Sequence, residues 1–93
     1  MTEGERLAVC VRVRGRVQGV GFRWKTREAA VARGLAGWVC NHPDGSVEAW
    51  IEGERSSVGE MLDWLRVGPR SARVDALESV ENAPQGLNGF QMR

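Results

Sequence analysis

The chain has 93 residues, a length that allows one domain with a single hydrophobic core and excludes two. Its composition, 42% hydrophobic and 27% charged residues with 12 glycines, is that of a globular domain. It contains no apolar run of 18 residues, and its first residues lack the basic and apolar regions of a secretory signal. We therefore predict a cytoplasmic protein with no membrane partner.

The net charge of +1 is distributed unevenly along the chain. Residues 12–27 contain six basic residues and no acidic one, so this segment carries +6 and the remainder −5. Such a concentration suits a small anionic ligand, because a nucleic-acid-binding domain is usually basic over a longer surface. We therefore predict no nucleic-acid partner. The alternative is a basic strand end that is simply solvated.

Few residues of this chain are typical metal ligands. Cys10 and Cys40 each fall in a predicted strand among apolar neighbours, which favours small core residues over a disulfide. The single histidine, His42, has no partner at a usual metal-ligand spacing. The sequence therefore predicts no metal site.

The first predicted element is a strand over residues 7–14, where apolar and other residues alternate. A glycine-rich segment follows it. From Phe22 to about Arg33 the apolar residues recur at helical spacing, and Gly34 is a natural stop for that helix.

The second half begins with a predicted β-hairpin. A turn is predicted at Pro43-Asp44-Gly45. It lies between a predicted strand over residues 37–41 and a second one over residues 47–52, where apolar and other residues alternate. Ser57 and Glu60 then form a capping box that predicts a second helix, and Gly68-Pro69 ends it.

A fourth strand is predicted over residues 73–81, and residues 89–92 are a candidate for a short fifth one. The order is therefore β-α-β-β-α-β. Two helices in these positions bury their apolar stripes only on one face of an antiparallel sheet. The sequence predicts an α+β fold, the ferredoxin-like split βαβ sandwich.

The glycine-rich segment is the strongest functional signal. Its glycines allow backbone N–H groups to converge on an anion, and the helix that follows adds its positive end. Arg23 lies in the first helical turn, where its guanidinium can grip two oxygens of that anion. A Walker A loop and a dinucleotide fingerprint are both excluded by the spacing; a tight turn without function is the alternative. The candidate cradle for a phosphate comprises Gly15, Arg16, Val17, Gln18, Gly19, Val20 and Gly21.

Asn41, at the end of the first hairpin strand, is a second candidate. Its carboxamide can hold a water molecule in a chosen direction without titrating, although asparagine commonly just begins a turn. Glu48 and Glu52 share one face of a strand, and we expect them to be solvated rather than a catalytic pair. Trp24 is expected at the surface beside the glycine loop.

Two segments resemble the acylphosphatase family. Residues 15–23 match its G-x-V-Q-G-V-x-F-R signature at every fixed position, and residues 37–48 match G-W-V-x-N-x-x-D-G-x-V-E likewise. The resemblance covers essentially the whole chain and implies a single acylphosphatase-like domain over residues 1–93. Cys40 departs from the family, many of whose members carry a basic residue there.

The resemblance implies a hydrolase that cleaves the carboxyl–phosphate anhydride bond of small acyl phosphates without metal or cofactor. By position, Arg23 is expected to bind the phosphate and Asn41 to orient the attacking water. The segment from Gly15 to Gly21 is the expected phosphate cradle. The expected partners are the acyl phosphate and inorganic phosphate, as product or inhibitor, and the expected state is a monomer.

Two other readings remain. A ferredoxin-like RNA-binding module would carry an aromatic stacking motif on a central strand, and that motif is absent. A sensor or carrier domain would keep the cradle without turnover, but Arg23 and Asn41 are both present. A related domain also begins larger hydrogenase-maturation proteins.

Overall fold

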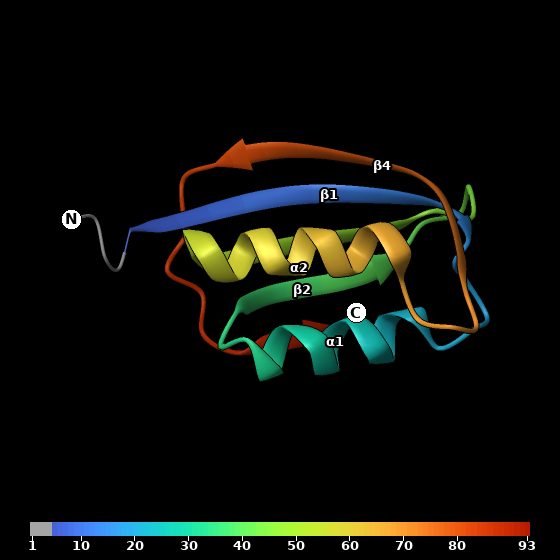
Figure 1. Ribbon diagram of the computed structural model, residues 1–93, viewed down its shortest axis with the longest axis horizontal. Helices are drawn as coiled ribbons and strands as arrows, with labels where there is room; N and C mark the ends of the chain where they lie inside the picture. The colour runs from blue at the N-terminus through green and yellow to red at the C-terminus, as the bar shows by residue number, and fades with distance from the viewer. Residues whose placement is uncertain (1–4) are drawn as a thin grey trace.

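The computed structural model describes residues 5–93, and Figure 1 shows both helices lying across one face of a single sheet. The element order is the predicted one, including the candidate short strand at its end. The elements are β1 (Arg6–Arg16), α1 (Phe22–Ala32), β2 (Ala36–Asn41), β3 (Val47–Glu54), α2 (Arg55–Val67), β4 (Arg73–Asn82) and β5 (Phe90–Met92). Neither helix is long and apolar enough to cross a membrane.

The strand order in the sheet is β4-β1-β3-β2-β5. β1 pairs antiparallel with both β3 and β4, and β2 pairs antiparallel with β3. The fifth strand, β5, runs parallel to β2. The predicted antiparallel sheet is therefore correct for four strands, and the fifth makes the sheet mixed, because the chain crosses from the β4 edge to the β2 edge before it pairs.

The core fills the space between the helices and one sheet face. α1 buries Phe22, Thr26, Ala29 and Ala30, the four residues that its helical spacing predicts. Alternate residues of the strands face them across the core. The largest completely buried apolar side chains of the remaining elements include Val9, Val11, Val13, Val39, Val47, Ile51, Val58, Met61 and Leu65.

The second helix begins earlier than predicted. Glu54 is its N-cap, with extended backbone and no side-chain cap bond, so Ser57 lies inside the first turn. The predicted capping box of Ser57 and Glu60 is therefore wrong. The reason is that β3 enters α2 without a loop, since Glu54 still pairs with Arg6 of β1.

Candidate active site

The glycine-rich segment divides into a strand end and a loop. Gly15 and Arg16 still belong to β1 and pair with the start of β4, across a shift of register after Arg14. Gly15 has φ of 134°, and a Cβ there would lie 2.2 Å from the carbonyl oxygen of Arg73. The close approach of β1 and β4 therefore requires glycine at this position. The loop itself comprises residues 17–21.

The loop ends at the N-terminus of α1. Gly21 is the N-cap residue, with φ of 77° in the left-handed region that favours glycine. No side chain caps α1, and its first turn has no acidic residue. Within residues 5–93, no backbone N–H of residues 18–21 donates to a protein group. These donors and the positive end of the helix are thus free for an anion.

Gln18 fastens the loop to the β2–β3 hairpin. Its Nε2 donates to the carbonyl oxygens of His42, at 2.7 Å, and of Ser46, at 2.9 Å. Both carbonyls flank the turn that follows Asn41. The loop and the end of β2 are therefore held side by side.

A cavity of about 170 Å³ opens where the loop, α1, β2 and β5 meet. It contains both residues to which the sequence assigns a catalytic role, Arg23 and Asn41, although they come from different elements. Its walls consist of Val17, Gly19, Gly21, Phe22, Arg23, Trp24, Asn41 and Met92. Trp24 is half exposed, as predicted.

The guanidinium of Arg23 is oriented by the end of β5. Its Nη1 donates to the backbone oxygen of Arg93 at 2.7 Å. Arg93 is itself held in place, because its N–H donates to the carbonyl oxygen of Val39 and its guanidinium lies 4.9 Å from the ring centre of Trp38. No carboxylate side chain of the described residues forms an ion pair with Arg23. The oxygen of Arg93 is the polar partner of the Arg23 guanidinium within residues 5–93.

Not every residue of the predicted cradle reaches the cavity. Val17, Gly19 and Gly21 line it, whereas Gln18 and Val20 do not. The side chain of Gln18 points to the hairpin, and the carbonyl oxygen of Val20 accepts a hydrogen bond from Ser71. Gly15 and Arg16 lie in β1, outside the cavity wall.

The local charge of +6 is also divided. Arg12 and Arg14 project from the opposite face of the sheet, where they form ion pairs with Asp44. The charge that is concentrated in the sequence is therefore spread over two faces of the sheet, because alternate residues of a strand point to opposite faces. Among the six, only Arg23 lines the cavity.

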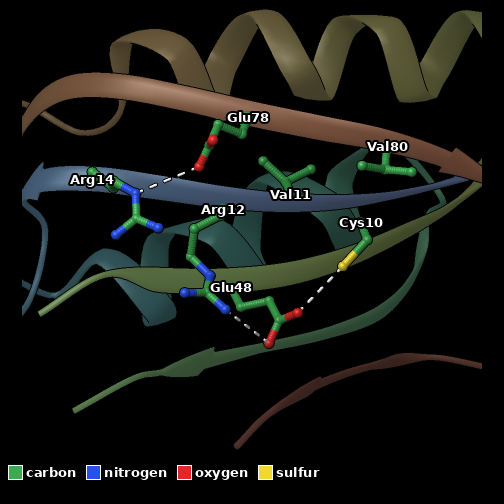
Figure 2. A pocket seen from close by; sticks show the side chains of 7 residues that line it. All are labelled: Cys10, Val11, Arg12, Arg14, Glu48, Glu78 and Val80. Atoms are coloured by element: carbon green, nitrogen blue, oxygen red, sulfur yellow. Dashed lines mark hydrogen bonds and ion pairs between the residues drawn. The ribbon is translucent and has the colours of Figure 1, made fainter. Parts of the chain in front are cut away.

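The open face of the sheet carries a polar cluster that the sequence analysis missed. Cys10 and Cys40 are free thiols, but they are half-buried there and not in the core, so the prediction that they are core residues is wrong. Figure 2 shows the carboxylate of Glu48 between Arg12 and the thiol of Cys10, at 3.9 and 3.3 Å. Burial and the bond to Glu48 raise the pKa of Cys10. The hollow here measures about 340 Å³.

Glu52 was expected to be solvated, and it is completely buried. Its carboxylate accepts hydrogen bonds from the indole of Trp50 and from the backbone N–H groups of Gln85, Gly86 and Leu87. Burial opposes the charge, but these four donors outweigh it and lower the pKa of Glu52. Glu52 thus anchors the connection that leads to β5.

The fold and the cavity define a ferredoxin-like α+β domain with a cavity at the start of its first helix. The family model for acylphosphatase matches residues 9–92. An acylphosphatase from Methanothrix thermoacetophila is 48% identical over 88 residues, covering 92% of this chain and 98% of its own. The chain therefore belongs to the acylphosphatase family and is a hydrolase of acyl phosphates.

Solved structures agree with this assignment. An acylphosphatase from Coxiella burnetii superposes with a TM-score of 0.93 at 36% identity, and each chain is covered completely. An acylphosphatase from Bacillus subtilis gives a TM-score of 0.91 at 34% identity, covering 94% of this chain and 98% of its own. The ferredoxin-like prediction is confirmed.

Proposed function

We propose that the phosphoryl group of a small acyl phosphate binds at the N-terminus of α1, with Arg23 as its charged ligand and Asn41 as the residue that orients water. The observation that carries this proposal is that both side chains line one cavity together with the glycine loop.

The cradle in this proposal is the loop of residues 17–21. Its free N–H groups at residues 18–21 and the uncapped helix end supply fixed partial positive charge. Arg23 adds a full positive charge in a planar fork that matches two phosphoryl oxygens. Gln18 acts indirectly in this scheme, by holding the loop against the hairpin.

Asn41 suits a reaction in which the protein orients the attacking water but does not deprotonate it. Its Oδ1 accepts and its Nδ2 donates, so the carboxamide fixes the direction of one water molecule. An acyl phosphate has a good leaving group, so positioning and charge stabilisation can supply most of the catalysis. The substrate phosphate itself accepts the proton of the water in this proposal.

The reaction joins the water oxygen either to phosphorus, breaking the P–O bond, or to the carbonyl carbon, breaking the C–O bond. Both routes release a carboxylic acid and inorganic phosphate. Hydrolysis in ¹⁸O-labelled water separates them, because the label enters phosphate in the first case and the acid in the second.

The acyl part of the substrate is proposed to lie against Trp24 and Met92. Their side chains are 50% and 45% exposed and line the apolar side of the cavity. An aromatic acyl group would stack there, whereas an acetyl group would touch little. We expect Trp24→Ala to raise KM for benzoyl phosphate more than for acetyl phosphate; equal effects would contradict this placement.

The role of Arg23 is tested by the hydrolysis of benzoyl phosphate. Removal of one charge-stabilising donor typically costs about 3–4 kcal/mol, so Arg23→Ala should lower kcat by about 10²–10³. Arg27→Ala is the matched control, because Arg27 also lies on α1 and donates to a backbone oxygen of β5, that of Phe90. Near-normal turnover by a folded Arg23→Ala variant would exclude this role.

Asn41→Ala should lower kcat while it leaves the inhibition constant of inorganic phosphate nearly unchanged, because Asn41 acts on water. Asn82→Ala is its control, an exposed asparagine on β4 far from the cavity wall. A loss of phosphate binding equal to the loss in kcat would instead make Asn41 a phosphate ligand.

A further inference from the structure

A second site lies on the open face of the sheet, beside the turn of the β2–β3 hairpin. We propose that Cys40, His42 and Glu48 bind a zinc ion there through Sγ, Nε2 and a carboxylate oxygen. The three donor atoms lie within 4.8 Å of one another. None of these residues lines the cavity that contains Arg23 and Asn41, so the inference does not rest on the proposed function.

The separations of the donor atoms are close to those that zinc requires. Nε2 of His42 lies 2.6 Å from Oε1 of Glu48, and Sγ of Cys40 lies 4.0 Å from the same nitrogen. Zinc bonds of about 2.0–2.3 Å in a tetrahedral site separate ligand atoms by about 3.3–3.6 Å. To bind zinc, the distance between His42 and Glu48 must lengthen and the distance between Cys40 and His42 must shorten. Rotation about one side-chain bond is enough for each change.

The hairpin register holds the three residues together. Cys40 lies directly opposite Glu48 in the β2–β3 pairing. The backbone of His42 is fixed on both sides, because its N–H donates to the carbonyl of Ser46 and its carbonyl accepts from Gln18. The site is therefore built on strands and on a braced turn, which favours a fixed geometry.

The donor set selects the class of ion. A thiolate, an imidazole and a carboxylate suit zinc, whereas magnesium and calcium require oxygen donors throughout. Zinc replaces the proton that Nε2 of His42 shares with Glu48, so that the neutral imidazole carries its single proton on Nδ1. The thiol of Cys40 releases its proton to solvent as the thiolate binds. Three protein ligands leave the fourth position to water.

Arg12 opposes a cation at this site. Its guanidinium lies 3.4 Å from Nε2 of His42 and 3.9 Å from Oε1 of Glu48. It has other anchors, the hydroxyl of Ser46 at 3.2 Å and the carboxylate of Asp44 at 3.6 Å. We therefore expect Arg12→Gln to bind zinc more tightly than the wild-type protein does.

Cys10 provides a matched control. Its thiol contacts the other oxygen of Glu48 in Figure 2, but it is on β1, whereas Cys40 is on β2. Since β3 lies between them, their Cα atoms are separated by two strand spacings, on the order of 10 Å. That separation is too long for a disulfide. The thiol of Cys10 is also not among the donor atoms that lie within 4.8 Å of one another, which are those of Cys40, His42 and Glu48.

The test is titration of the reduced, untagged protein with Zn²⁺ by calorimetry, and with Co²⁺ as a coloured substitute. We expect one saturable site per chain and a thiolate-to-cobalt charge-transfer band. Cys40→Ser should abolish that band, and His42→Ala should weaken zinc binding more than about 100-fold, beyond the cost of losing an outer-shell partner. Cys10→Ser should keep both the band and the affinity.

His42→Ala removes a side chain from a turn whose backbone bonds remain, so its folding is not at risk. Zinc should raise the melting temperature of the wild-type protein but not that of this variant. Absence of a saturable site overturns the proposal. So does a Cys10→Ser variant that loses binding as completely as Cys40→Ser, or an Arg12→Gln variant that binds zinc more weakly.

Discussion

Gln18 and His42 are joined by a hydrogen bond of 2.7 Å that connects the loop of residues 17–21 to the hairpin carrying Asn41. A second bond from the same nitrogen reaches Ser46. One amide group thus satisfies two carbonyls on either side of a turn. The loop that precedes Arg23 is thereby held against the hairpin that contains Asn41.

Gln18→Ala should lower kcat for benzoyl phosphate more than it raises KM, because it misplaces Asn41 without removing a phosphate ligand. The carbonyls of His42 and Ser46 each lose one hydrogen bond but keep a backbone donor, the N–H of Gly45 and of His42. Loss of two hydrogen bonds should lower the free energy of unfolding by about 1–3 kcal/mol. Gln18→Glu should be worse than Gln18→Ala, since it brings a carboxylate against both carbonyls. A Gln18→Glu variant with unchanged kcat and an unchanged free energy of unfolding would contradict the role of Gln18 in holding the loop against the hairpin.

Substitutions at two glycines should differ sharply. Gly15→Ala places a Cβ 2.2 Å from a backbone oxygen at φ of 134°, whereas Gly19→Ala at φ of 73° meets nothing within 4 Å. Backbone strain alone costs about 1–3 kcal/mol, and only the first change adds a clash with backbone. Denaturant unfolding should show a clearly larger loss for Gly15→Ala. Equal losses would mean that the strands separate easily at Gly15.

Glu52 should contribute to stability in a pH-dependent way. Its pKa is lowered in the folded protein, so its contribution is present above the pKa of the unfolded chain and is lost as the pH falls through the folded value. Glu52→Gln should lower the free energy of unfolding near pH 7 by about 3 kcal/mol, since several donors lose a charged acceptor. At acidic pH the wild-type protein and the variant should converge; parallel curves would argue against Glu52 as the source.

The start of α2 offers a test of where the helix is capped. Glu54 occupies the N-cap position without a side-chain bond, so Glu54→Ser should stabilise the protein by about 0.5–1 kcal/mol. Ser57→Ala should leave the free energy of unfolding within about 0.5 kcal/mol, because Ser57 lies inside the helix. A loss of about 1 kcal/mol for Ser57→Ala would restore Ser57 as the cap. Thermal unfolding followed by circular dichroism measures both.

Strong periodicity made most of the fold predictable. The buried residues of α1 are those of its helical stripe, because a helix on a sheet can bury only one side. The start of α2 was not predictable from the capping pattern, since a strand that continues into a helix has no loop in which to place a cap. β5 pairs in parallel with β2 because the chain crosses from one edge of the sheet to the other. No local sequence pattern indicates that crossing.

The candidate site was predictable as a set of residues but not as a geometry. Arg23 and Asn41 were found from motifs, yet only the fold brings them into one cavity. The cluster of Cys40, His42 and Glu48 has no typical metal-ligand spacing along the chain. Its residues come together only because β2 pairs with β3. The predicted β-hairpin is the sequence feature that could have indicated this cluster, because the turn after Asn41 places Cys40 opposite Glu48.

The β2–β5 pairing has a consequence for biosynthesis. The cavity wall extends in sequence from Val17 to Met92, and Arg23 is oriented by Arg93. A nascent chain therefore cannot assemble this site until β5 has left the ribosome and docked against β2. Such long-range pairing also tends to slow folding, so activity should be the last property that the refolding protein regains.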